Sequence, residues 1–410
     1  MFNLKYEVKK INNINGVRDS TIPFLISTLL KNNNIFYVAK NDSELSNIYN
    51  FLSYNFKDIH IFKIPAWDCL PYDISSPNFS IVSERIKSFS KLCFFKKNKE
   101  KNIFLTTINA LVTKTAPRGF YKKNFISLTN KTEHSLNTLT NFLINTGYKR
   151  VQTVRELCEF SLRGSILDIF PIGYSKAFRI DFFGQTIETI KVMDPLTQRS
   201  SVHVENINIY SSNEYLLSEE NIENFRKKFR SLYADQSIKN SIYEKVSSGI
   251  KFNGIEHYLP LLHKETLCSI FDFLPKDEDI IFLLTKNFFK LIAERELEIK
   301  HFSDERKIQN PEYNLISIEE LYLTTKNVKE HLKSFKRINL NEFDQIENKD
   351  DNEINLYSKP LIISNYIDTE DTNKINNFVK FCINKSLDNK KIIVITEENS
   401  SINNLIYFFF

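Results

Sequence analysis

Glycine is scarce in this sequence, and the glycine-lysine pair of a nucleotide-binding loop is missing. Only 8 of the 410 residues are glycine, and none of them precedes a lysine. A P-loop needs that pair, because backbone amides and one ammonium group together hold the phosphates. Downstream of the first glycine, the P-loop spacing would place Gly, Lys and Ser or Thr where the chain has Thr21, Ile22 and Pro23. The sequence therefore excludes ATP hydrolysis by a Walker A loop within this chain.

Metal-binding and catalytic patterns are also missing. The five cysteines are scattered without a C-x-x-C pair, which favours a reducing compartment and disfavours a structural zinc site. His257 and His263 are six residues apart without an H-E-x-x-H motif, so we expect surface or partly buried histidines. No G-x-S-x-G motif occurs, and we expect Glu156 and Glu159 on a solvated face. We predict no catalytic residue, no metal and no cofactor for this chain.

Long apolar runs and a strong net charge are missing as well. The apolar runs, such as residues 280–284, fall far short of the roughly 20 residues that a membrane span needs. Charges lie within the first ten residues and no apolar stretch follows them, so we expect no signal peptide and a cytoplasmic protein. The 55 Lys and Arg residues against 50 Asp and Glu residues give a net charge of only +5, which does not by itself indicate a nucleic-acid binder.

Strand and helix patterns alternate over the first 120 residues. The β-rich runs and the apolar helical faces between them occupy residues 35–39, 45–52, 58–64, 81–93 and 103–107. Strands separated by helices of this length are typical of a parallel sheet with helical crossovers. We therefore predict that residues 1–120 form an α/β domain or the first part of one.

Short β-rich runs dominate residues 121–210, after one helix near residues 136–143. The predicted strands are residues 165–169, 178–183, 185–193 and 202–210, joined by short connections that contain Gly or Pro. Such connections favour an antiparallel meander. We predict a small α+β domain inserted in the chain.

Helix and strand patterns return over residues 211–343. An apolar helical face is formed by Ile222, Phe225 and Phe229. Residues 280–284 form a buried-strand candidate, and Ser317 with Glu320 predicts a capping box. Residues 344–356 are rich in acids and are predicted to be a linker. We expect residues 357–410 to begin a further α/β domain, which the apolar run 405–410 indicates is cut short.

One strand of the inserted domain carries an unusual outward face. Over residues 178–183, period-two alternation puts apolar residues on one face and Arg179, Asp181 and Phe183 on the other. A lone outward Phe can simply lie under a loop. Beside an arginine, however, Phe183 makes the aromatic and guanidinium pair that carries binding energy at protein interfaces.

This region resembles the interaction domain that UvrB shares with the bacterial transcription-repair coupling factors. The sequence RGSILDIFP at residues 163–171 matches the RG-x-x-x-DIFP core, and RIDFFG at 179–184 matches the R-x-[DE]-FFG strand. Other segments are similar to the coupling factors, namely PAWDCLPYD at 65–73, TQRS at 197–200 and GIEHYLPL at 254–261. UvrB itself should show a Walker A loop and a Tyr-rich hairpin, and the sequence has neither.

The resemblance implies a degenerate RecA-like domain split into two halves, residues 1–120 and 211–343, around the inserted domain. It also implies that the RNA polymerase-binding module and the ATP-dependent translocase domains of the family come after residue 410. We therefore expect no ATP-driven translocation, and no contact with RNA polymerase, from this chain alone.

The resemblance further implies that the inserted domain binds UvrA, the damage-sensing subunit of nucleotide excision repair. By position, the family's basic and aromatic contacts fall on Arg163, Arg179 and Phe183. Residues 121–210 contain 11 Lys and Arg against 8 Asp and Glu, a mild bias toward an acidic partner. The expected role is recruitment of UvrA to stalled RNA polymerase.

Two other functions stay open at the level of sequence. The lysine-rich segment FFKKNKEKN, residues 94–102, favours a non-specific DNA-binding module, although such charge runs usually form solvated loops. An ATPase with an unusual phosphate loop is the remaining alternative.

Overall fold

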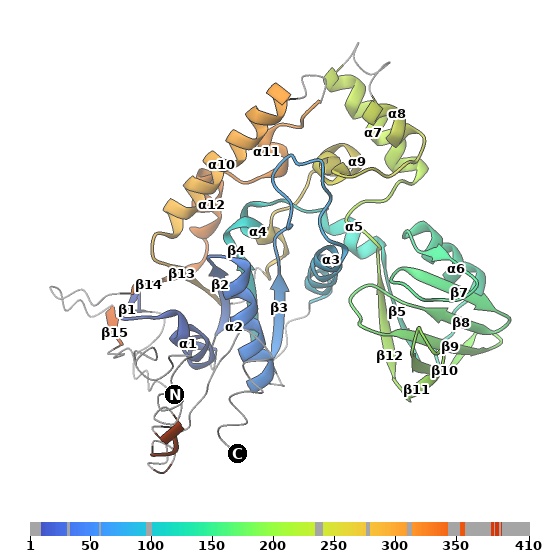
Figure 1. The fold of residues 1–410 in the computed structure, drawn as a ribbon, viewed down its shortest axis with the longest axis horizontal. Coiled ribbons are helices and arrows are strands. Elements are labelled where there is room, and N and C mark those ends of the chain that lie inside the picture. The colour runs from blue at the N-terminus through green and yellow to red at the C-terminus, as the bar shows by residue number, and fades with distance from the viewer. Residues whose placement is uncertain are drawn as a thin grey trace.

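The computed structural model describes residues 10–30, 33–56, 59–95, 101–233, 241–275, 279–309, 314–342 and 353–356, with residues 379–380, 382–384 and 387. Two lobes are visible in Figure 1, a larger one around a parallel sheet and a smaller one, drawn in green, around an antiparallel sheet. The predicted third domain and the lysine-rich loop at 96–100 lie outside the described residues, apart from those few near 380.

The large sheet has seven parallel strands contributed by both ends of the chain. In spatial order they are β15 (Glu353–Asn355), β1 (Asn13–Asn15), β14 (Lys336–Leu340), β13 (Ile280–Thr285), β2 (Asn34–Ala39), β4 (Asn102–Thr107) and β3 (His60–Ile64). Strands from before and after the smaller lobe therefore lie side by side. This arrangement confirms the predicted α/β fold in which an inserted domain splits a parallel sheet.

The central strands are buried on both faces, which is why they are continuous apolar runs in the sequence. One face packs on α1 (Ile22–Leu29) and α2 (Asp42–Asn55), and the other on α3 (Phe79–Cys93), α4 (Ile108–Val112) and α10 (Phe288–Gln309). On the second face, four phenylalanines stack at matching positions of adjacent strands, with ring centroids 4.3 to 6.1 Å apart, namely Phe62, Phe104, Phe36 and Phe282. These rings align because the parallel register places them opposite one another.

Further helices surround this sheet and connect it to the smaller lobe. They are α5 (Arg118–Lys123), α7 (Glu219–Tyr233), α8 (Ser241–Ser247), α9 (Leu259–Leu262), α11 (Ile318–Leu321) and α12 (Thr325–Leu332), with the 3₁₀ turns η2 (Asp19–Thr21), η4 (Ile255–Tyr258) and η5 (Ile270–Phe273). Ser317 is the N-cap of α11 as predicted, but the predicted capping box is wrong, because its side chain makes no capping hydrogen bond.

The smaller lobe is a six-stranded meander with one helix, α6 (Leu136–Asn145). Its strands, in spatial order, are β11 (Ser200–His203), β10 (Thr186–Met193), β9 (Ala177–Phe183), β8 (Ile166–Ile169), β7 (Glu159–Arg163) and β6 (Lys149–Arg150). All pairs are antiparallel except β6 with β7. The antiparallel meander predicted from the turn residues is therefore confirmed.

Two predicted segments differ from the structure. Residues 202–210 are not one strand, because the chain leaves the meander after His203, and β12 (Asn206–Tyr210) pairs instead with β5 (Phe125–Thr129). The predicted linker at 344–356 is wrong for its last residues, since β15 adds to the large sheet beside β1. Asparagine side chains bond across this edge, with Asn15 Nδ2 2.8 Å from Asn355 Oδ1.

Candidate interaction surface

The meander has one apolar face and one polar face, as the alternation in β9 predicts. Phe178, Ile180 and Phe182 are buried in the core, whereas Arg179 and Asp181 are half-buried on the opposite face. Because Arg163 of β7 lies across from Ile166, and Ile166 across from Asp181, Arg163 belongs to the same outward face. We call this outward side of β7 to β10 the polar face.

Phe183 ends β9 on the polar face and has 80% of its surface exposed. It lies opposite Thr186, and the turn between them begins with Gly184, whose φ of +61° suits glycine. The hairpin therefore holds the ring outward on a paired strand end rather than on a loop. The prediction that Phe183 is exposed is confirmed.

Arg163 and Arg179 meet on Asp168 of β8. Arg179 binds this carboxylate through two atoms, with Nε 2.6 Å from Oδ1 and Nη2 2.9 Å from Oδ2. Nη2 of Arg163 also contacts Oδ2. The Asp168 carboxylate and the Arg179 hydrogen bonds favour the charged form, so the pKa of Arg179 lies above its usual value.

The sequence analysis places Arg163 and Arg179 among the partner-binding residues, and the structure shows that the two guanidinium groups are not equally free to contact a partner. Arg179 uses its bidentate edge inside the domain, and only 22% of its side chain is exposed. Arg163 is 53% exposed and donates a single bond to Asp168. The sequence analysis also missed Asp168 as a member of this cluster, since its place directly opposite Arg179 is known only from the pairing of β8 with β9.

The polar face continues toward Phe183 with a second charged group. Asp181 Oδ2 accepts a hydrogen bond from Thr189 Oγ1 at 2.8 Å and lies 3.4 Å from Lys191 Nζ. These groups neutralise one another, whereas the three-residue cluster of Asp168 with two arginines keeps one positive charge. The face can therefore offer guanidinium donors and a large apolar side chain to a carboxylate-bearing partner.

Helix α3 fixes this lobe to the large sheet. Gly173, in the turn after β8, donates its N–H to Ser83 Oγ at 2.8 Å, and its carbonyl accepts from Lys87 Nζ at 2.7 Å. The ammonium of Lys87 also lies over the ring of Tyr174, 5.8 Å from its centroid. The polar face is thus carried by a lobe with defined contacts to the rest of the chain.

The histidines are more buried than the sequence analysis predicts. His257 and His263 are both almost fully buried, so the expectation of surface or partly buried side chains is wrong. His257 stacks on Tyr72, and His263 Nε2 lies 2.9 Å from the carbonyl oxygen of Glu214. Burial lowers the pKa of each histidine to about 4, so both are neutral packing residues at pH 7.

Glu156 is exposed, whereas Glu159 is half-buried and accepts backbone hydrogen bonds from Arg155 and Glu156.

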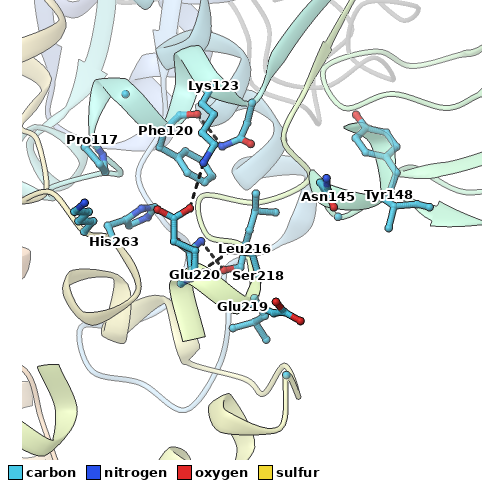
Figure 2. A pocket seen from close by; sticks show the side chains of 18 of the residues that line it. Pro117, Phe120, Lys123, Asn145, Tyr148, Leu216, Ser218, Glu219, Glu220 and His263 are labelled. Carbon is cyan, nitrogen blue, oxygen red and sulfur yellow. Dashed lines mark hydrogen bonds and ion pairs between the residues drawn. The ribbon is translucent and has the colours of Figure 1, made fainter. Parts of the chain in front are cut away.

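A cavity of about 950 Å³ lies at the junction of the two lobes, between α5, the end of α6 and the start of α7. Figure 2 shows Lys123 and Glu220 pointing toward each other there, and their charged atoms are 3.3 Å apart. Basic and acidic side chains line it in similar numbers, with the lysines Lys123, Lys149, Lys251 and Lys264 and the glutamates Glu219, Glu220 and Glu265. The charges of this lining nearly cancel, so they do not indicate the charge of a ligand.

No helix of the described residues combines the length and apolarity that crossing a membrane requires.

Comparison with known proteins identifies the smaller lobe and its surroundings. Residues 126–215 match the family described as the UvrB interaction domain. The chain is 31% identical to the transcription-repair-coupling factor of Haemophilus influenzae over 313 residues, which is 75% of this chain and 26% of that protein. Similar proteins of the same name occur in Rickettsia bellii (31% over 309 residues, 74% and 27%) and Escherichia coli K12 (28% over 285 residues, 70% and 24%).

The chain thus spans about a quarter of the length of the curated relatives it matches. The matched domain covers nearly all of the small lobe, including Arg163, Asp168, Arg179 and Phe183. We conclude that this chain is homologous to the N-terminal part of the transcription-repair coupling factors and contains a UvrB interaction domain.

Proposed function

We propose that this chain recruits UvrA during transcription-coupled nucleotide excision repair, and that Arg163, Arg179 and Phe183 on the polar face form the binding site. The observation that carries the proposal is the exposed ring of Phe183 on the same sheet face as a positively charged cluster, within the matched interaction domain. Aromatic and arginine side chains are the residues that most often dominate binding energy at protein interfaces.

Each group would supply a different part of the binding energy. Burying a fully exposed Phe side chain against a partner contributes roughly 1.5–3 kcal/mol. The half-exposed guanidinium of Arg163 would pair with a carboxylate on UvrA, and such charge-assisted bonds also fix the orientation of the two proteins. Because the ring and the guanidinium lie on one sheet face, the partner can reach both without a large rearrangement.

We further infer that this chain is an adaptor without ATPase or translocase activity of its own. The turn between β1 and α1 lacks the P-loop lysine, and its acidic Asp19 binds Lys40, which also binds Glu342. The lysine nearest this turn is thus already paired with two carboxylates, Asp19 in the turn and Glu342 after β14, so its charge is not available to a nucleotide phosphate. ATP-driven movement on DNA and contact with RNA polymerase are therefore assigned to other parts of the coupling factors, and a cytoplasmic location follows from the proposed role.

Calorimetric titration of the purified chain with UvrA tests the proposal. Because Phe183 is already exposed in this chain, we expect micromolar or tighter binding in the absence of both ATP and RNA polymerase. Absence of binding at micromolar concentrations, from a protein with a cooperative unfolding transition, would overturn it.

A further inference from the structure

Asp168 is the least accessible member of the charged cluster on the polar face. Its side chain is only 1% exposed, whereas the arginines that bind it reach the surface. Both of its oxygen atoms are occupied, Oδ1 by Arg179 and Oδ2 by Arg179 and Arg163 together. A carboxylate in this position cannot be reached by a docking partner, so any role it has in binding must act through the two guanidinium groups.

The register of the meander sets the directions of both arginines. Asp168 lies directly opposite Arg179 in the β8–β9 pair, and Arg163 reaches it diagonally from β7, where its own partner is Ile166. A bidentate pair fixes the plane of a guanidinium as well as its position. Arg179 is therefore held in one orientation, and Arg163 is held beside it with most of its donors directed away from the carboxylate.

A turn braces Arg179 from its other side. The carbonyl oxygen of Gln198 accepts from Arg179 Nη1 at 3.4 Å, and Gln198 itself has a φ of +61°. Its side-chain amide donates to the carbonyls of Val154 and Pro195, at 2.9 and 2.7 Å, which fixes the turn. The segment TQRS at 197–200 thus helps to hold Arg179 through Gln198.

We propose that Asp168 is a positioning residue for partner binding, which fixes the directions of Arg163 and Arg179 on the polar face without contacting the partner. This inference rests on the proposed function. Without Asp168 the cluster would carry one more positive charge, but the two like-charged side chains would repel each other and would have to be ordered when the partner binds. The loss of order outweighs the gain in charge, because exposed charges are screened by salt and long side chains are costly to immobilise.

The test is a double-mutant cycle in the full chain, measured as UvrA affinity by calorimetry. We expect Asp168→Asn to weaken binding about tenfold or more, because the neutral amide has only one acceptor oxygen and can no longer bind Arg179 through two bonds. In an Arg163→Ala background, Asp168→Asn should weaken binding much less, since Asp168 then has only Arg179 left to position. A purely structural role would give the same loss in both backgrounds.

The controls separate this inference from the proposed function and from misfolding. Glu205→Gln removes an exposed carboxylate of the same domain outside the cluster and should leave affinity unchanged. If Asp168→Asn does not unfold cooperatively, the double variant Asp168→Asn with Arg179→Gln replaces it, because it leaves no partly buried charge unpaired. In that double variant, Arg163→Ala should reduce UvrA affinity less than it does in the unaltered chain. Failure of the unaltered chain to bind UvrA overturns the proposed function. Two results would overturn this inference alone, provided that the unaltered chain binds UvrA. One is an Asp168→Asn affinity within twofold of the unaltered chain, and the other is a loss from Asp168→Asn that is equally large in the Arg163→Ala background.

Discussion

Arg85 and Glu214 form an ion pair in which both side chains are excluded from solvent, with Nε 2.7 Å from Oε1. Arg85 belongs to α3 of the large lobe, and Glu214 follows β12, where the chain leaves the small lobe. The guanidinium also donates to the carbonyl of Pro65 and lies over the rings of Trp67 and Phe89, each centroid 5.4 Å away. The pair therefore joins the two lobes at their boundary.

Breaking this pair should destabilise the protein strongly. Removing one partner leaves a buried charge unpaired, so we expect Glu214→Ala to lower the free energy of unfolding by about 3–5 kcal/mol. Urea denaturation measures the change. The double replacement Arg85→Met with Glu214→Leu is the matched control, because it removes both charges and should cost much less. A loss below about 1 kcal/mol for Glu214→Ala would show that the pair is unimportant.

Two adjacent phenylalanines should respond differently to the same substitution. Phe182 is 4% exposed and Phe183 is 80% exposed, because successive residues of β9 face opposite sides of the sheet. We expect Phe182→Ala to cost about 3–5 kcal/mol of folding stability, since it leaves a cavity in the core. Phe183→Ala should change stability by no more than about 0.5 kcal/mol. Thermal unfolding of both variants checks this, and equal losses would mean that the assignment of the two faces is wrong.

The buried histidines make stability depend on pH. Burial lowers the folded-state pKa of His257 and of His263 to about 4, whereas an unfolded histidine titrates at about 6.5. Between these values the unfolded chain binds more protons, so the free energy of unfolding falls as the pH falls through this window. The slope should be about 1.4 kcal/mol per pH unit for each histidine. Burial raises the pKa of Glu256, so this carboxyl makes the free energy of unfolding rise as the pH falls, opposite to the histidines. Glu256 is present in all the variants compared, so its contribution is the same in each.

Substitution of one histidine isolates this effect. Urea denaturation at several pH values should give His257→Gln a shallower pH dependence than the unaltered chain shows. The control is His203→Gln, which replaces an exposed histidine and should reduce the slope less. An unchanged slope for His257→Gln would contradict the account.

Two glycines test the contact between the segments 65–73 and 254–261, both of which resemble the coupling factors. Gly254 has a φ of +85°, and a Cβ atom there would lie 2.8 Å from the carbonyl oxygen of Asp73. Gly164 also has a positive φ, +62°, but a Cβ atom there would meet nothing within 4 Å. Alanine at either position should therefore lower the free energy of unfolding by about 1–2 kcal/mol, because the backbone there is left-handed. Only Gly254→Ala adds a clash with main-chain atoms. Denaturation should show the larger loss for Gly254→Ala, and equal losses would argue against the close approach.

Local patterns predicted those parts of the fold that depend on neighbouring residues. The alternation in β9 placed Phe183 outside because strand periodicity needs no tertiary information, and the apolar run of β13 marked a buried strand. Strands β1 and β15 were missed because both are three residues long and contain asparagines. Those polar side chains are tolerated since they bond to one another across the edge of the sheet, as Asn15 does with Asn355.

Features that depend on register or packing could not be predicted in the same way. The bidentate pair of Asp168 and Arg179 requires the exact alignment of β8 with β9, which one sequence does not define. The burial of His257 requires the loop of Tyr72 to pack against a segment nearly two hundred residues away. Polarity alone favoured exposure for that histidine, and tertiary packing overrode it.

Comparison of UvrA affinity for the unaltered chain and for Phe183→Ala tests the central claim most directly. Calorimetry should show that Phe183→Ala weakens the free energy of binding by about 2 kcal/mol or more, because UvrA would remove the ring from water in the proposed interface. Tyr54→Ala is the matched control, since Tyr54 is an equally exposed aromatic residue on α2 of the other lobe and should leave binding unchanged. A Phe183→Ala variant that binds UvrA as tightly as the unaltered chain would contradict the account.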